Sequence, residues 1–174
     1  ASRIYSYVVE KMNWNRLVGV YTRDGVRKAY KENTGNVAEI NLILTAMLRA
    51  ANLEAYPVLV STKSNGIPLF PTINGFNYVI TAIELPQGVF LLDATDKNAD
   101  MGVLETHVIN GNGRVIFGEN ASDWIAVTSV IPAISQSMLS VDIDRDLKIF
   151  GKGQQRFSGN FALSYRNTYR DLSS

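Results

Sequence analysis

Three carboxylates and one phenol are the side chains of this sequence that could carry acid–base chemistry. Glu39 lies in an apolar stretch with helical spacing, Tyr78 lies in a β-branched run, and Asp93 and Asp96 follow another such run. A pair of carboxylates can hydrolyse a glycoside, with one acting as the acid and the other as base or nucleophile. That mechanism depends on the distance between the two carboxyl groups, which the sequence does not set. A hydrolase that uses carboxylate or phenol chemistry therefore stays open.

Thiol and metal chemistry have little support. The chain contains no cysteine, which removes disulfides, thiolate metal sites and thiol nucleophiles together. Its single histidine, His107, argues against a histidine-rich zinc site. The segment 96–100 resembles the start of a calcium loop, but Met101 replaces the required glycine and His107 stands where the bidentate glutamate belongs. We therefore expect no metal and no cofactor.

Composition sets the broad class. The chain has 174 residues, of which 46% are hydrophobic and 19% charged, so a real core can form. The formal net charge is only +1, and we expect neither nucleic acid nor an anionic membrane as partner. The longest apolar stretch, 41–60, is interrupted by Arg49, Glu54 and Pro57, which argues against membrane insertion by this segment. Because the chain begins at Ala1 within a helical pattern, we expect a piece of a longer polypeptide.

The elements that must position these groups change from helices to strands along the chain. Helical spacing predicts one helix near the N-terminus, a polar one over 23–31 capped by Thr22 or Asp24, and an apolar one. The apolar helix opens after Asn36, ends near Asn52, and presents one stripe, made of Ile40, Leu44, Met47 and Ala51.

After this helix the periodicity indicates strands. We expect strands over 55–62, 76–84, 89–93, 114–117 and 124–127, with Trp124 in the core and a loop over 63–75. That loop is a candidate binding rim. Beyond Pro132 we expect strands over 138–150 and 157–165 joined by Gly151–Gly153. The fold class is therefore α+β, with a core over 1–132 and a β-hairpin extension over 133–174 that could begin a second β domain.

Three segments together resemble the transglutaminase-like superfamily with its papain-like core, in particular its bacterial multidomain members of unknown function. They are the helix from Gly35 to Val58, the strand Phe76–Ile80 and the strand end Leu91–Asp96. The resemblance implies a papain-like α+β core in which a cysteine opens the helix, a histidine lies on the next motif strand and a carboxylate orients that histidine. It also implies neighbouring β domains and an extracytoplasmic location, in the periplasm or at the cell surface.

At the matching positions the chain has Val37, Tyr78 and Asp93, which we call the degenerate triad. A helix N-terminus stabilises a thiolate, but valine has no ionisable proton and no lone pair, so it cannot transfer an acyl group. Tyrosine, with a pKa near ~10, is a poor proton acceptor at neutral pH. The purely structural interpretation is that Val37 and Tyr78 pack in the core and that Asp93 bonds to Tyr78 or to backbone N–H groups.

The resulting expectation is a catalytically inactive domain that serves as a binding or scaffolding module in a larger exported protein. Asn36, Glu39 and Asn77 are the candidate residues of a vestigial cleft for a peptide, protein or glycan. Glu39 could instead cap the helix start. An open cleft would favour binding, whereas a cleft filled by Val37 and its neighbours would favour a structural role. The alternative is a hydrolase built around Asp93, Glu39 and Tyr78.

Overall fold

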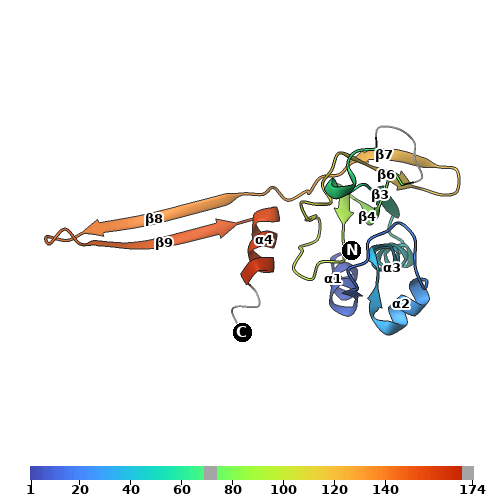
Figure 1. The fold of residues 1–174 in the computed structure, drawn as a ribbon, viewed down its shortest axis with the longest axis horizontal. Helices are drawn as coiled ribbons and strands as arrows, with labels where there is room; N and C mark the ends of the chain where they lie inside the picture. The colour runs from blue at the N-terminus through green and yellow to red at the C-terminus, as the bar shows by residue number, and fades with distance from the viewer. Residues whose placement is uncertain (69–73, 170–174) are drawn as a thin grey trace. The chain divides into compact units, whose positions relative to one another are not determined.

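The computed structural model describes residues 1–68 and 74–169 and divides into two compact units, 1–130 and 131–174. The sequence-based boundary after residue 132 lies close to this division. Figure 1 shows both units as ribbons, and each is described here by itself. The first unit holds the candidate site residues.

Helices and one short strand pair form the N-terminal part of the first unit, and Figure 1 labels its helices. They are α1 (Ser2–Lys11), β1 (Asn13–Trp14), α2 (Val26–Glu32), β2 (Thr34–Gly35) and α3 (Val37–Ala50). β1 and β2 pair in parallel. Helix α3 begins and ends as its polar flanks predict: Asn36 is its N-cap, and Asn52 has a left-handed φ of 58°.

An antiparallel sheet follows, with the described strands in the order β5-β4-β3-β6-β7. Its strands are β3 (Ala55–Val60), β4 (Tyr78–Leu85), β5 (Gly88–Leu92), β6 (Asn112–Ile116) and β7 (Ser122–Ala126). β4 and β5 form a hairpin closed by a two-residue turn after Leu85, in the gap between the strands expected over 76–84 and 89–93. The mixed helix and antiparallel sheet architecture confirms the α+β class.

Two apolar clusters fill the first unit. The first joins α1 and α3 to the sheet and includes Val8, Leu44 and Ile83, each with no exposed surface. The second includes Val37, Tyr78 and Val108, also with no exposed surface, so it lies around two degenerate triad positions. Burial of such side chains stabilises the fold by about 1.5–3 kcal/mol each.

Several details of this unit differ from the expectation. Helix α2 starts at Val26, after a Gly25 N-cap with φ of 88°, and neither Thr22 nor Asp24 caps it with a side chain. Ala51 is exposed, so the buried stripe of α3 continues through Leu48. Residues 63–65 form a 3-10 turn within the expected loop. Trp124 is 54% exposed because it shares a face of the sheet with Arg114, opposite to the face of the buried Val115, so its placement in the core was wrong.

The second unit contains β8 (Ser135–Ile143), β9 (Ile149–Phe157) and α4 (Gly159–Tyr169). A hairpin is present, but its expected turn was wrong. The chain reverses over 144–148, where the Asp144 carboxylate accepts the backbone N–H groups of Asp146 and Lys148. Gly151 and Gly153 lie inside β9 instead.

The expected strand over 157–165 was also wrong, since most of it is helix α4. Its aromatic residues, which favoured a strand, follow a helical spacing: Tyr165 stacks with Tyr169 at 4.7 Å between ring centroids. Gly159, with φ of 55°, makes the bend between β9 and α4.

None of the helices in the described part of the chain combines the length and apolar character needed to cross a membrane.

Candidate functional site

The start of α3 is closed by a capping box. The Asn36 side chain accepts the Glu39 N–H at 2.8 Å, and the Glu39 carboxylate accepts the Asn36 N–H at 2.9 Å. The Asn36 amide also donates to the Tyr21 carbonyl at 2.9 Å. Both candidate cleft residues are therefore buried and bonded within the protein.

The second oxygen of Glu39 binds the segment before α2. It accepts backbone N–H groups from Arg23, Asp24 and Gly25 at 2.9, 2.8 and 3.2 Å. Burial alone would raise the pKa of Glu39, but the four backbone N–H groups favour the carboxylate and lower this pKa overall. Of the two roles considered for Glu39, its hydrogen bonds are those of a helix cap and loop anchor.

Val37 is the first residue of α3 and has no exposed surface. Its N–H, one of the donors at the helix N-terminus that have no partner within the helix, donates to the Leu17 carbonyl at 3.2 Å. This donor is therefore already bonded to the main chain. Its side chain belongs to the same apolar cluster as Tyr78 and Leu104. The position that matches the nucleophilic cysteine of the resembled family is thus occupied by a buried hydrocarbon side chain.

Tyr78 and Asp93 are hydrogen-bonded to each other. The Tyr78 hydroxyl donates to Asp93 Oδ2 at 2.8 Å and lies 3.1 Å from Thr95 Oγ1. Burial, followed by the charge of Asp93, raises the pKa of Tyr78 far above its ordinary value. The phenol therefore stays protonated and donates a hydrogen bond to the carboxylate, as the purely structural interpretation of Asp93 predicted.

Asn41 completes the network around Asp93, and sequence reasoning gave it no role. Its amide nitrogen donates to Asp93 Oδ1 at 2.9 Å and to the Val79 carbonyl at 2.9 Å, while its oxygen accepts the Ala94 N–H at 3.0 Å. Asp93 Oδ1 also accepts the N–H and hydroxyl of Thr95 at 3.0 and 2.8 Å. The available signal was an asparagine at the spacing of a core residue in an apolar helix, since a buried polar side chain needs a partner, and the structure leaves Asn41 with no exposed surface.

His107 lies beside the degenerate triad although it is far from it in sequence. Its ring makes an edge contact with Tyr78 at 5.6 Å between centroids, and its Nδ1 lies 2.8 Å from Glu105 Oε2. This hydrogen bond raises the pKa of His107, while burial acts in the opposite direction. Nothing in the spacing of the motifs indicated that His107 and Glu105 would lie here.

Asn77, the third candidate cleft residue, ties two segments of the sheet together. Its side chain accepts the Thr62 N–H at 2.9 Å and donates to Thr62 Oγ1 at 2.9 Å. The candidate rim 63–75 includes residues 69–73, which lie outside the described residues. Its described part is fixed by Asn110, whose amide donates to the carbonyls of Ser61 and Gly66.

Taken together, these residues make the contacts of structural residues rather than those of catalytic ones. Asp93 is only 4% exposed and Glu39 only 3%, and their oxygens are engaged by different partners, so they do not form a carboxylate pair on an open surface. Within the described residues, no group of three or more metal-ligating side chains comes together. No protein-family model matches the chain, and neither does any curated protein or solved structure compared with it.

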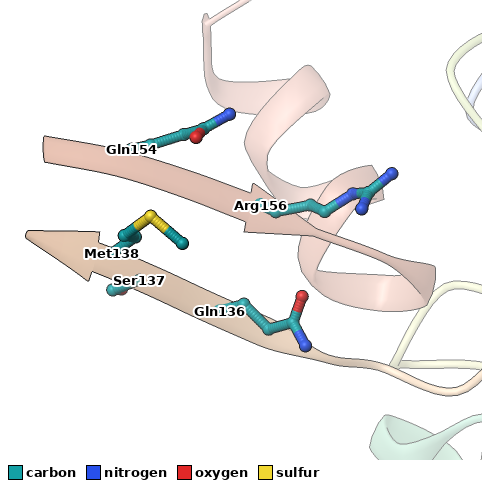
Figure 2. A pocket seen from close by; sticks show the side chains of 5 residues that line it. All are labelled: Gln136, Ser137, Met138, Gln154 and Arg156. Carbon is teal, nitrogen blue, oxygen red and sulfur yellow. The ribbon is translucent and has the colours of Figure 1, made fainter.

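The second unit contains a hollow of about 490 Å³. Figure 2 shows its lining side chains on β8 and β9, which are Gln136, Ser137, Met138, Gln154 and Arg156. Gln136 is opposite Arg156, and Met138 is opposite Gln154, in the strand register. None of the residues selected from the sequence lies in it.

Proposed function

We propose that this chain is a catalytically inactive member of the transglutaminase-like superfamily, with a papain-like core, that serves as a scaffolding module in a larger exported bacterial protein. The observation that carries the proposal is the state of the degenerate triad. Val37 and Tyr78 have no exposed surface, and the polar groups of Tyr78 and Asp93 are satisfied by each other and by their neighbours. A substrate would have to displace these contacts.

Scaffolding is favoured over binding in the cleft because the side chains of the candidate cleft residues are hydrogen-bonded within the protein. Asn36 and Glu39 hold the start of α3, and Asn77 holds Thr62. Each of these side chains stabilises the first unit through bonds that a ligand would need to break. The same facts count against the hydrolase alternative around Asp93, Glu39 and Tyr78, which requires an accessible carboxylate.

The hairpin of the second unit supports a role within a larger assembly of β domains. In the register of β8 and β9, one face carries Leu139, Val141, Ile143 and Ile149, which are 73%, 47%, 64% and 70% exposed. The opposite face is mixed: it carries Asp142, Lys152 and Arg156 together with the exposed Met138 and Phe150. Such alternation is typical of strands covered on one face, and we propose that a neighbouring β domain of the same polypeptide covers it.

Restoring the missing groups tests the proposed ancestry. In the variant Val37→Cys with Tyr78→His, the new thiol lies in the first turn of α3 and the imidazole lies beside Asp93. We expect a thiol pKa below its usual value of ~8.5, measured by the ultraviolet absorbance of the thiolate, which needs no access of a reagent to this buried position, because the helix dipole and the imidazolium favour the thiolate. A thiol that titrates at or above this value would contradict the proposed correspondence of residues 37 and 78.

Activity assays test the inactivity itself. The unaltered chain is expected to be inactive toward peptide, amide and glycoside substrates and in acyl transfer to amines. An activity that disappears in Asp93→Asn while the fold is retained would refute the proposal and support the carboxylate hydrolase. The Asp123→Asn variant is the matched control, since Asp123 is exposed on β7.

A further inference from the structure

The hairpin of the second unit has two open strand edges. Within the described residues, β8 pairs only with β9, so each strand has one edge without a neighbouring strand. Every residue of β8 is exposed. A two-stranded hairpin is only marginally stable by itself in water, whereas a sheet of three or more strands with an apolar face is stable. The hairpin therefore gains stability if a further strand pairs with one of these edges.

The register shows which backbone groups of β8 point out of the hairpin. At its two ends, the Ser158 N–H donates to the Ile134 carbonyl at 2.9 Å, and the Asp144 N–H donates to the Lys148 carbonyl at 3.0 Å. In an antiparallel pair, residues that bond to the partner strand alternate with residues whose N–H and C=O groups point away from it. The even-numbered residues of β8 therefore bond to β9, and the odd-numbered residues from 135 to 143 offer their backbone groups at the free edge.

The two free edges differ in their side chains. β8 contains no proline and no glycine, and its one charged residue, Asp142, lies near its end. β9 carries two cations, Lys152 and Arg156. Its middle contains Gly151 and Gly153, which have no side chains to pack across a strand pair. Because charged residues such as lysine commonly protect an exposed edge, the edge of β8 is the one open to pairing.

Charge complementarity favours a second copy of the chain as the partner. When two β8 strands pair antiparallel about a two-fold axis at Leu139, their full length overlaps and odd-numbered residues meet odd-numbered residues. Asp142 of one copy then lies opposite Gln136 of the other, whose neighbour on β9 is Arg156.

This pairing brings the Asp142 carboxylate to the hollow that Gln136 and Arg156 line (Figure 2). The Cα atoms of Asp142 and Arg156 are then two strand spacings apart, roughly 10 Å, which an aspartate and an extended arginine can bridge. Within one copy, neither side chain forms an ion pair with another described residue. The second copy therefore supplies each of them with an opposite charge.

We propose that two copies of this chain pair along β8 into one antiparallel sheet, in the strand order β9-β8-β8-β9, with an Asp142–Arg156 contact on each side of the two-fold axis. The pairing also places the exposed Leu139, Val141 and Ile143 of both copies on one face of the sheet. It uses an edge of the hairpin and leaves that face to a covering domain. The inference therefore does not depend on the proposed function.

Sedimentation equilibrium of the unaltered chain tests whether the dimer forms. We expect a reversible monomer–dimer equilibrium between micromolar and millimolar concentration, because the interface is a single strand edge. A two-fold pairing closes after two copies, whereas pairing of β8 with β9 of the next copy would continue into open assemblies. A chain that stays monomeric over this range, or that grows into open assemblies, would overturn the proposal.

Proline substitution tests which edge pairs. The Ser137 N–H points out of β8, so Ser137→Pro removes a donor of the dimer and none of the hairpin, and we expect the dimer Kd to rise at least about tenfold. Gln155→Pro is the matched control, because Gln155 lies opposite Ser137 and its N–H points out of β9. The dimer Kd should change by less than about twofold in this control. Equal effects of the two substitutions, or a larger effect of Gln155→Pro, would overturn the proposal.

Charge exchange tests the contact between the copies. Asp142→Arg and Arg156→Asp each place like charges together in the dimer, so each should raise the dimer Kd by about threefold to tenfold. The double variant restores opposite charges and should return the Kd to within about twofold of the unaltered value. Within one copy, the two residues pair with Phe150 and Gln136 on separate rungs of the hairpin, so a monomer offers no such rescue. Effects that simply add in the double variant would overturn the proposal.

Discussion

Replacing Asp93 with alanine is expected to lower the free energy of unfolding by about 3 kcal/mol. The structure gives the reason. Asp93 Oδ1 accepts one Asn41 N–H and the Thr95 N–H, and both donors lose their acceptor in the variant. An unsatisfied buried donor costs about 1–3 kcal/mol, and the half-buried Thr95 N–H belongs at the lower end of this range. The Thr95 hydroxyl also loses Asp93 as its acceptor, but it lies 3.1 Å from the Tyr78 hydroxyl, so the two can bond to each other, and the half-buried Thr95 leaves the remaining O–H access to water; the hydroxyls therefore add little.

Urea unfolding followed by circular dichroism measures this loss, as a lower midpoint at an unchanged slope. Asp93→Asn serves as the conservative comparison. Its side-chain oxygen can keep the contacts of Oδ1 and its NH₂ group can face the Tyr78 oxygen, so we expect a loss of about 1 kcal/mol. Asp123→Ala, at an exposed position, should change stability by less than about 0.5 kcal/mol. A loss below about 1 kcal/mol in Asp93→Ala would refute the reasoning, since the network would then be open to water.

Two further substitutions test contacts inside each unit taken by itself. Glu39→Gln should cost about 1–3 kcal/mol, because a neutral amide oxygen replaces the carboxylate that accepts the N–H groups of residues 23–25. The pKa of Glu39 is lowered in the folded state, so its contribution to stability is present above the unfolded value of ~4.3 and is lost as the pH falls through the folded value. The free energies of unfolding of the unaltered chain and of Glu39→Gln should therefore differ above ~4.3 and converge as the pH falls below it. Gly159→Ala should destabilise the second unit by more than about 1 kcal/mol, because the new Cβ would lie 2.7 Å from the Pro132 carbonyl oxygen at a residue with φ of 55°. The melting temperature of the second unit should fall in Gly159→Ala. It should fall less in Gly153→Ala, where only a leucine methyl lies within 4 Å of the new Cβ.

Local signals in the sequence predicted much of the first unit. Asn36 and Asn52 mark the ends of α3 through local effects that sequence spacing captures: the Asn36 side chain caps the first turn, and Asn52 adopts the left-handed φ that follows the last one. The β4–β5 hairpin was predictable for the same reason, since two β-branched runs flank a short turn. The pairing of Tyr78 with Asp93 was anticipated from the family resemblance and not from any local pattern.

The parts that were missed depend on contacts between distant segments. Asn41 has the spacing of a core residue, and only the fold shows that it bonds to Asp93. His107 reaches Tyr78 because an irregular segment crosses the cluster, and no periodicity describes such a segment. In the second unit, the glycines at 151 and 153 suggested a turn, but the Asp144 side chain stabilises the actual turn.

The accessibility of position 37 tests the central claim of a closed centre most directly. The chain has no cysteine, so Val37→Cys introduces a single thiol of nearly the same size at a position with no exposed surface. We predict that a thiol reagent such as Ellman's reagent labels the folded variant at least about a hundredfold more slowly than the urea-unfolded variant, because labelling requires local opening. Labelling of the folded variant at the rate of the unfolded chain would contradict a centre packed shut by its own side chains.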